Sequence, residues 1–106
     1  MLSHLQSGKA WTVTDRYGNE IYLTWERWAH ILEFHPEMEL FLDEIRRAVQ
    51  TSRRRQDSHN PYKWFYVRWH LDGLEPWNNC IVVVVAFRPE DERFVVTSYQ
   101  DTIRER

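Results

Sequence analysis

The sequence has little cysteine, little glycine and no long hydrophobic run. Among its 106 residues are one cysteine and three glycines. A lone cysteine cannot form an intramolecular disulfide, and so few glycines exclude the glycine-rich phosphate loop. The longest apolar run, residues 81–87, is far too short to span a bilayer, and residues 1–10 lack the basic flank and apolar core of a signal peptide. We therefore expect a cytoplasmic protein.

The net charge of the chain is small, but its charged residues are unevenly distributed. A formal net charge of −2 argues against an indiscriminate electrostatic binder of nucleic acid. Up to residue 45, three basic residues accompany eight acidic ones, whereas eleven basic residues face eight acidic ones in the remainder. The densest basic cluster comprises Arg46, Arg47, Arg53, Arg54 and Arg55. These arginines are typical either of a solvated helix end or of an anion-binding surface, and the sequence leaves both interpretations open.

The first half of the chain predicts a β-hairpin followed by two helices. Alternating residues at 11–14 and 20–23 flank a turn-rich segment, which is typical of a hairpin. Thr24 is a good helix N-cap, and Trp25, Trp28, Ala29 and Leu32 recur at helical spacing, so residues 25–34 should form an amphipathic helix.

A proline separates this helix from the next one. Pro36 disfavours a helical conformation at His35 and suits the first position of a new helix, so the chain should turn there. Helical periodicity then predicts a second helix over residues 37–50, with Met38, Phe41, Leu42, Ile45 and Val49 on its apolar face. Residues 51–61 contain no large apolar side chain and should form an exposed loop.

The second half predicts three strands. Residues 80–87 show no alternation, so both faces of this strand should be buried, whereas residues 94–99 alternate. Residues 62–71 also alternate, with a predicted core face of Phe65, Val67, Trp69 and Leu71 opposite Tyr62, Trp64, Tyr66, Arg68 and His70. The aromatic residues of this second face are expected either to pack under a helix or to stack on bases.

Together these elements predict a single α+β domain. Its expected order is β-β-α-α-β-β-β, with an N-terminal hairpin and a helix pair packed on a three-stranded antiparallel sheet. Residues 1–10 should form a polar arm, residues 11–103 the folded core, and the chain from residue 100 a frayed tail.

Metal and thiol chemistry have weak support. His30 and His35 are five residues apart with a proline after the second, so they do not form the i, i+4 pair of a zinc-binding helix. Cys80 precedes an apolar strand and is interpreted as a structural thiol rather than a nucleophile. We expect neither a metal nor a cofactor.

A metal-free acid/base site fits the remaining residues better. RNA cleavage without a metal needs a base for the 2′-hydroxyl, an acid for the leaving 5′-oxygen and cationic donors for the phosphorane. Histidine suits the first two roles and arginine the third. The sequence offers His30, His35 and His70, together with Arg68 and the arginines of residues 53–55.

Several short motifs resemble a family of small nucleases. They are residues 28–37 (WAHILEFHPE), Tyr66 to Arg68, the valine run of residues 81–85 and the closing residues 95–99 (VVTSY). Over residues 11–103 the chain is similar to the Barnase, EndoU, colicin and RelE group (BECR), above all its phage-associated and polymorphic-toxin members.

The resemblance implies a function and residue roles. It implies a metal-independent endoribonuclease acting on RNA, such as tRNA or ribosomal RNA, with a possible neutralising protein partner. The implied catalytic residues are His30, His35, Arg68, Thr97 and Tyr99. The predicted substrate-binding residues are Arg53, Arg54, Arg55, Tyr66 and His70.

Two other function classes stay open. A non-catalytic module of the same fold would use the aromatic and basic face of residues 62–70 to bind RNA or a protein partner. An oligomerising domain is the third hypothesis, because six tryptophans in so short a chain can supply surplus apolar surface.

Overall fold

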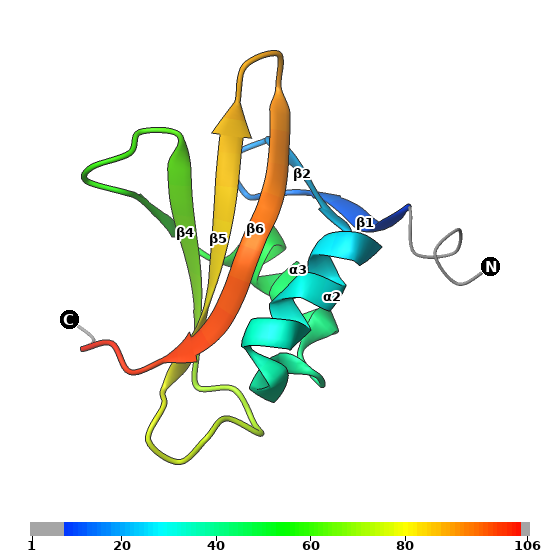
Figure 1. Ribbon diagram of the computed structural model, residues 1–106. Coiled ribbons are helices and arrows are strands. Elements are labelled where there is room, and N and C mark those ends of the chain that lie inside the picture. Colours follow the sequence, from blue (N-terminus) through cyan, green and yellow to red (C-terminus); the bar gives the residue numbers. More distant parts are fainter. Residues whose placement is uncertain (1–7, 105–106) are drawn as a thin grey trace.

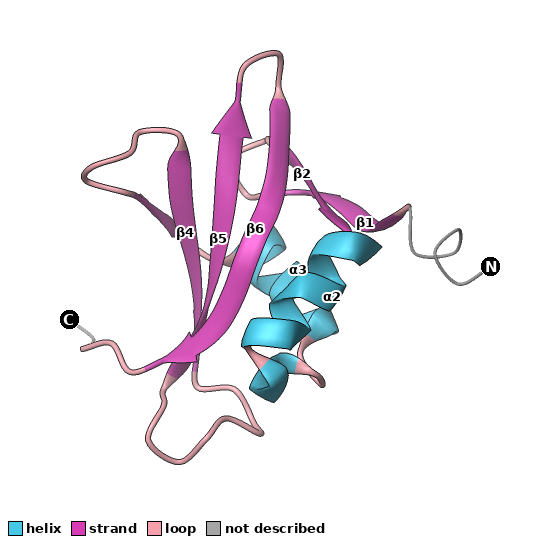
Figure 2. Ribbon diagram, in the orientation of Figure 1, coloured by secondary structure: helices cyan, strands magenta, loops and turns pink. Residues whose placement is uncertain are grey.

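The computed structural model describes residues 8–104 and shows an α+β domain built on one mixed sheet (Figure 1). Its strands are β1 (Lys9–Thr14), β2 (Glu20–Thr24), β3 (Arg54–Gln56), β4 (Lys63–Trp69), β5 (Cys80–Arg88) and β6 (Glu92–Asp101). Two α-helices, α2 (Trp25–Phe34) and α3 (Leu42–Thr51), are separated by a short 3-10 helix, η1 (Pro36–Met38). Both α-helices pack on the same side of the sheet (Figure 2).

The sheet has six strands in the order β1-β2-β6-β5-β4-β3. The predicted α+β class is confirmed, and β4, β5 and β6 pair antiparallel as predicted. They do not form a separate three-stranded sheet, however, but belong to the six-stranded mixed one. The N-terminal hairpin joins the same sheet through a parallel pairing of Tyr22 in β2 with Phe94 in β6. Sequence alternation identifies individual strands but not which distant strands become neighbours.

The N-terminal hairpin forms as predicted. β1 and β2 pair antiparallel, and Asp15 organises the turn between them by accepting hydrogen bonds from the backbone N–H groups of Tyr17 and Asn19. Gly18 has φ of 86°, a conformation that glycine adopts without strain. β1 begins at Lys9, so Lys9 and Ala10 are strand residues instead of part of a polar arm. Residues 1–7 of that predicted arm lie outside the described residues.

The first helix has its predicted bounds. The Thr24 side chain accepts a hydrogen bond from the backbone of Arg27, and the helix ends at Phe34, with His35 as its C-cap before Pro36. Its fully buried residue is Ile31, and Trp28 and Leu32 pack beside the core. Ala29, predicted on the buried face, is exposed, because the helix turns the side containing Ile31 toward the sheet.

The predicted continuous helix over residues 37–50 is wrong. η1 ends at Met38, and α3 begins only at Leu42 after Phe41 leaves helical geometry, with φ of −110° and ψ of 13°. Met38, Phe41 and Ile45 are all buried. Two short helical segments therefore satisfy the same apolar spacing as one long helix, and the spacing does not distinguish them.

β5 is the buried strand that the sequence predicts. Every residue from Cys80 to Ala86 is buried, and β5 pairs antiparallel with β4 on one side and β6 on the other. Ser98, predicted to share a face with Phe94 and Val96, instead pairs with Val83 on the helix side. The register shifts beside Val84 and Val85, and such a bulge inserts one extra residue that reverses the alternation.

The predicted loop over residues 51–61 contains an unexpected strand. β3 pairs antiparallel with the first half of β4, Arg54 opposite Tyr66 and Gln56 opposite Trp64. The strand lacks an apolar pattern because it is a polar edge strand. The predicted frayed tail from residue 100 is also wrong in part, since β6 runs to Asp101 and Ile103 exchanges hydrogen bonds with the Asn79 side chain. Residues 105–106 of that tail lie outside the described residues.

Apolar residues gather on both faces of the sheet. The larger cluster lies between the sheet and the helices and includes Ile21, Ile31, Ile45, Tyr66 and Val83. On the opposite face a smaller buried cluster of Cys80, Val82 and Val84 is surrounded by partly exposed residues, which are Phe65, Val67, Trp69, Val96, Tyr99 and Ile103. No helix within residues 8–104 is long and apolar enough to cross a membrane.

Candidate nucleic-acid interface

An open groove lies along β4 on the side of the sheet that the helices leave uncovered. Its volume is about 700 Å³. Its apolar floor comes from the smaller cluster, and its rim from α3, β3 and the end of β6. We call it the strand groove, lined by Thr51, Ser52, Arg53, Arg54, Arg55, Phe65, Val67, Arg68, Trp69, Val82, Tyr99, Asp101 and Ile103.

The short length of β3 is one reason why the groove exists. β3 pairs with β4 only from Trp64 to Tyr66, whereas β4 continues to Trp69. The edge of β4 beyond Tyr66 is therefore flanked by the end of α3 and the start of β3 instead of by a full strand. Side chains of that edge, among them Val67 and Trp69, line the groove.

Two arginines of the groove rim are exposed and are not neutralised by a described acidic residue. Arg53 and Arg55 are exposed, and neither makes an ion pair with another residue within 8–104. Asp101 is the carboxylate among the lining residues. The groove thus places two exposed guanidinium groups beside an aromatic floor.

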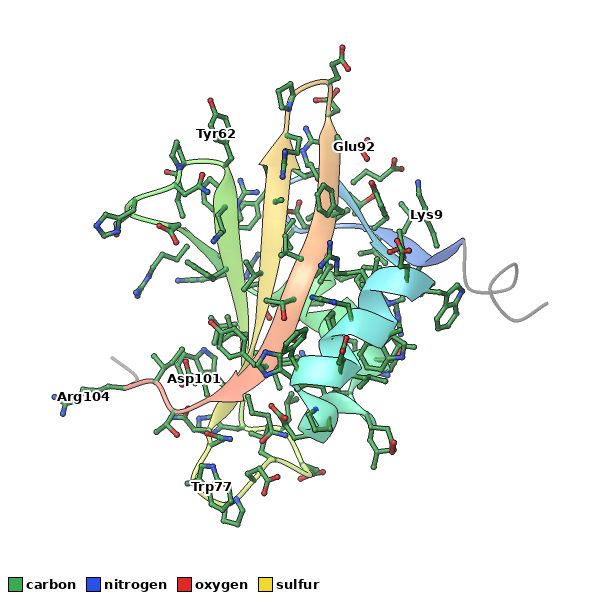
Figure 3. All side chains as sticks on the ribbon, viewed as in Figure 1. Lys9, Tyr62, Trp77, Glu92, Asp101 and Arg104 are labelled. Carbon is green, nitrogen blue, oxygen red and sulfur yellow. The ribbon has the colours of Figure 1, made fainter. Side chains whose placement is uncertain are left out.

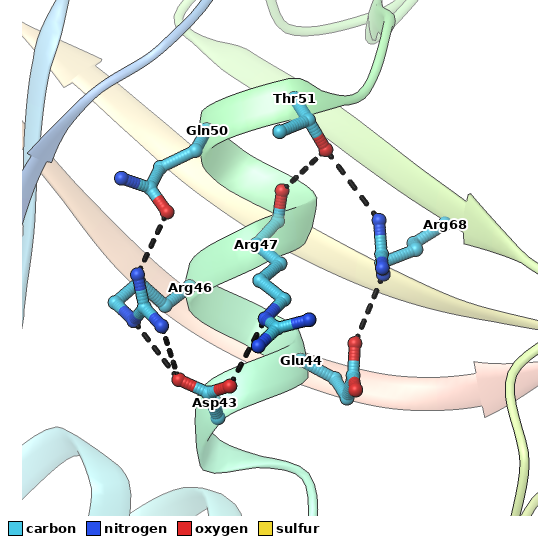
Figure 4. Close-up of polar contacts among 7 residues, drawn as sticks. All are labelled: Asp43, Glu44, Arg46, Arg47, Gln50, Thr51 and Arg68. Atoms are coloured by element: carbon cyan, nitrogen blue, oxygen red, sulfur yellow. Dashed lines mark hydrogen bonds and ion pairs between the residues drawn. The ribbon is translucent and has the colours of Figure 1, made fainter.

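Arg68 is held more tightly than these two. Its Nε donates to Glu44 Oε1 of α3 at 3.0 Å, and its Nη1 lies 3.5 Å from the Thr51 hydroxyl, as Figure 4 shows. The Thr51 hydroxyl in turn donates to the carbonyl of Arg47 at 2.8 Å. The register of β4 places the Arg68 side chain on the helix side with Tyr66. Arg68 is about one quarter exposed and borders the groove at the uncovered edge of β4 while it remains paired with Glu44.

Arg54 is among the lining residues, but its guanidinium lies on the opposite side of the sheet, against Asp15, Tyr66 and Trp64. Its Nη1 lies 3.4 Å from both Asp15 Oδ2 and the Tyr66 hydroxyl, and its Cζ is 4.1 Å from the Trp64 ring centroid. Tyr66 has no exposed surface, and its hydroxyl donates to Asp15. The predicted substrate-binding residues Arg54 and Tyr66 therefore belong to an interior polar cluster, and Tyr66 offers no surface to a substrate.

The two ionisable partners in this cluster have shifted pKa values. Burial raises the pKa of Asp15, but hydrogen bonds from Tyr66, Asn19 and the Tyr17 backbone outweigh burial and hold the pKa below its ordinary value. Burial, reinforced by the hydrogen bond to Asp15, raises the pKa of Tyr66 far above that of a free tyrosine. At neutral pH the cluster therefore contains a carboxylate, a neutral phenol and a guanidinium.

The predicted catalytic histidines lie apart from each other. His30 is exposed on α2, where its Nδ1 lies 4.0 Å from Glu33 and its ring contacts Phe34. It borders a separate depression lined by Glu26, Arg27, Ala29, His30 and Glu33. His35 instead lies at the helix joint, 3.6 Å from Glu37 and with its ring centroid 5.6 Å from that of Tyr99.

β6 brings one further predicted residue to the groove. Tyr99 lines it, and burial, followed by the nearby Asp101 and Cys80, raises the pKa of the Tyr99 phenol. Thr97 is half-buried opposite Val84 and is not among the lining residues. Of the predicted catalytic set, Arg68 and Tyr99 line the groove, and His35 adjoins it through Tyr99.

His70 lies just beyond β4 and does not line the groove. It is exposed, has φ of 56°, and its ring centroid is 6.4 Å from that of Trp69. Its positive φ ends the alternation of the strand. The following Leu71 accordingly packs against the helix-side cluster instead of joining Phe65 and Trp69.

Sequence reasoning missed the aromatic floor. Phe65, Val67 and Trp69 were predicted as a core face, and the opposite face was the candidate for base stacking. The structure reverses these positions, because the helices cover the side containing Tyr66. Alternation shows that two faces differ but not which of them a helix covers. The arginine cluster of residues 53–55 was a usable signal for an anion-binding surface.

Metal ligands and relatives give no further assignment. Residues 8–104 contain no group of three or more His, Cys, Asp or Glu side chains that could hold a metal ion. Comparison of the chain with protein-family models, curated proteins and solved structures finds no match. The geometry of the strand groove is therefore the main indication of function.

Proposed function

We propose that this domain binds single-stranded RNA in the strand groove. The observation that carries the proposal is that Arg53 and Arg55, both exposed, line the same groove as the partly exposed residues Phe65, Trp69 and Tyr99. Proteins that bind single strands combine cations that follow the phosphates with aromatic rings on which bases stack. Both kinds of group line the same groove here.

A single strand suits the groove better than a duplex. The faces of paired bases are stacked inside a double helix and cannot reach an aromatic floor, whereas the bases of a single strand can turn outward. The net charge of −2 also argues against binding driven by charge alone. Stacking and local guanidinium contacts together would supply the affinity.

The salt dependence of RNA binding tests this proposal. Fluorescence anisotropy of a labelled 12-nucleotide single-stranded RNA, in excess chelator and over a series of salt concentrations, gives both affinity and slope. The Arg53→Gln/Arg55→Gln double variant should lower the slope of log K against log salt by about 1.4, since each phosphate contact on a single strand contributes about 0.7.

A matched double variant separates local contacts from net charge. Arg27 on α2 and Arg88 at the end of β5 lie outside the groove, and replacing both with Gln changes the net charge equally. The Arg27→Gln/Arg88→Gln protein should keep the parental slope. Equal slopes for both double variants, or absence of binding by the parent, would contradict the proposed groove.

Endoribonuclease activity is a second candidate, and the contact of His35 with Tyr99 favours it. A base would take the 2′-hydroxyl proton as that oxygen attacks phosphorus, and an acid would protonate the departing 5′-oxygen. His35 would accept the 2′-hydroxyl proton as base and then, as the protonated acid, donate a proton to the departing 5′-oxygen, while Arg68 would stabilise the phosphorane charge. His30 and Thr97, which the nuclease resemblance implies, lie outside the groove, so this candidate assigns the chemistry to His35.

Product analysis separates cleavage from binding. Cellular RNA, with tRNA and ribosomal RNA as separate probes, is incubated with the protein in excess chelator. Fragments ending in 2′,3′-cyclic phosphate that disappear with His35→Ala but persist with His59→Ala, an exposed histidine outside the groove, would support the endoribonuclease. Loss with His30→Ala alone would move the site to α2, and intact RNA bound in the groove would leave the binding function.

A further inference from the structure

Arg54, on the three-residue strand β3, lies against three aromatic rings. The Arg54 guanidinium carbon is 4.2 Å from the Tyr17 ring centroid, 4.1 Å from that of Trp64 and 5.4 Å from that of Phe87. Its side chain is only 17% exposed. Because cation–π contacts strengthen when they are shielded from water, this arrangement fixes the guanidinium against the helix side of the sheet.

Asp15, the acidic partner of Arg54, is itself held in place by hydrogen bonds. The side chain of Asp15 has no exposed surface and accepts hydrogen bonds from the backbone N–H groups of Tyr17 and Asn19, the Asn19 amide and the Tyr66 hydroxyl. Asp15 belongs to the β1–β2 turn and Tyr66 to β4. Arg54 therefore ties β3 to two other parts of the sheet at once.

β3 has few other contacts to hold it. It consists of three residues, and its pairing with β4 covers only three positions, which is short for a stable edge strand. Successive side chains of a strand point to opposite faces. With Arg54 held on the helix side, Arg55 therefore faces the groove, and Arg53, which immediately precedes β3, also lines it.

We propose that Arg54 is a positioning residue for RNA binding: anchored to Asp15 and Tyr66, it holds β3 so that Arg53 and Arg55 face the strand groove. Arg54 itself does not contact the RNA. This inference rests on the proposed RNA-binding function. It adds that contacts on the helix side of the sheet fix the position of the arginines on the groove side.

The test compares how steeply the RNA affinity of each variant falls with salt, as the slope of log K against log salt. Arg54→Met keeps much of the side-chain length but removes the charge and the donors. It should lower the salt slope by about 1.4, as Arg53→Gln/Arg55→Gln does, although it removes only one cation. Adding Arg54→Met to that double variant should lower the slope no further, because the positioned groups are already absent. Arg88→Met, a surface change outside the groove, should keep the parental slope.

Two controls distinguish positioning from general stability. All slopes are measured well below the thermal midpoint of each variant, where a merely less stable protein keeps its parental slope. Tyr66→Phe, which removes only the hydroxyl, serves if Arg54→Met does not fold, and it should lower the slope by a smaller amount. A parental slope for the folded variant, or a loss fully additive with the double variant, would overturn the inference.

Amide hydrogen exchange tests the anchorage without RNA. In Arg54→Met the amides of β3 should exchange at least tenfold faster than in the parent, while those of β5 stay unchanged. If the parent fails to bind RNA but β3 loosens as expected, the RNA-binding function fails and the anchorage stands. If the parent binds RNA and β3 exchange is unchanged, the anchorage fails and the RNA-binding function stands.

Discussion

The two faces of the central sheet contain similar residue types but differ in what covers them. On the helix side, Tyr66 and Val83 are fully buried beneath α2 and α3. On the groove side, Phe65, Val67 and Trp69 remain partly exposed and are bordered by charged residues. The difference indicates that helix-side apolar residues mainly stabilise the fold, whereas groove-side residues combine moderate stabilisation with an accessible surface.

The largest expected effect compares two isoleucines from opposite faces. Ile45 is fully buried in α3, whereas Ile103 is half-buried against the groove-side cluster. Ile45→Ala should lower the free energy of unfolding by about 2–5 kcal/mol, because it leaves a cavity in the core. Ile103→Ala should cost about 1 kcal/mol or less, since its environment is already open to solvent. Urea unfolding measures both, and equal losses would contradict the distinction between the faces.

The interior polar cluster gives the next largest effect and a dependence on pH. Asp15→Asn should lower the free energy of unfolding by about 1–3 kcal/mol, since it weakens two buried hydrogen-bond partners, Tyr66 and Arg54. The pKa of Asp15 is lower in the folded than in the unfolded state. Its contribution is therefore fully present above the unfolded pKa of about 3.9 and is lost as the pH falls through the lower folded pKa.

Unfolding measured as a function of pH checks the sign of this contribution. The parent should lose stability more steeply than Asp15→Asn below about pH 4, because the variant has no carboxylate to protonate at that position. Asp43 and Asp57, whose pKa values are also lowered, are present in both proteins and cancel in the comparison. If the unfolding free energies of the two proteins fall equally steeply below pH 4, Asp15 does not stabilise the fold through its charge.

Two tryptophans sharpen the contrast between groove and surface. Trp69 lines the groove, whereas Trp77 is 69% exposed in the β4–β5 connection and points away from the sheet (Figure 3). Trp69→Leu should weaken binding of single-stranded RNA by about 1–3 kcal/mol, the usual contribution of one stacked base. Trp77→Leu should leave the affinity unchanged. Anisotropy titrations at one salt concentration measure both affinities. Equal losses of RNA affinity in the two variants would place the stacking surface elsewhere.

The smallest expected effect concerns the ion pair at the groove edge. Glu44 occupies Arg68, so Glu44→Gln should free the guanidinium for phosphate and tighten RNA binding by up to about fivefold, or about 1 kcal/mol. Glu39→Gln makes the same charge change at an exposed position in the joint between η1 and α3. The smaller increase in RNA affinity of Glu39→Gln measures the general effect of removing one negative charge. Equal gains for the two variants would show that Glu44 does not restrain Arg68.

Much of the local structure could be predicted because it depends on neighbouring residues. Thr24 caps α2 and Pro36 stops it, and both effects act within one helical turn. The unbroken apolar sequence of β5 predicted a strand buried on both faces, as the structure has it. β3 escaped prediction because a short polar edge strand depends on pairing with β4 instead of on its own residues.

The candidate site was predictable only as a set of residue types. The sequence placed arginines, histidines and aromatic residues in the chain but could not bring them together in space. His30 and Arg68 appeared equally suited to one catalytic centre, yet His30 lies on the exposed side of α2 and Arg68 lines the groove. Tyr66 and Trp69 appeared as opposite faces of one strand, and only the position of the helices decided which face stays open.

By itself the sequence determined the α+β class, the hairpin, the first helix and the buried central strand, because short-range sterics and hydrophobic periodicity act along the chain. The tertiary structure alone decided the parallel contact of β2 with β6, the bulge that turns Ser98 inward and the groove beside β4. Each of these depends on contacts between residues far apart in sequence. Their free energy comes from burying surfaces against one another, which no local pattern specifies.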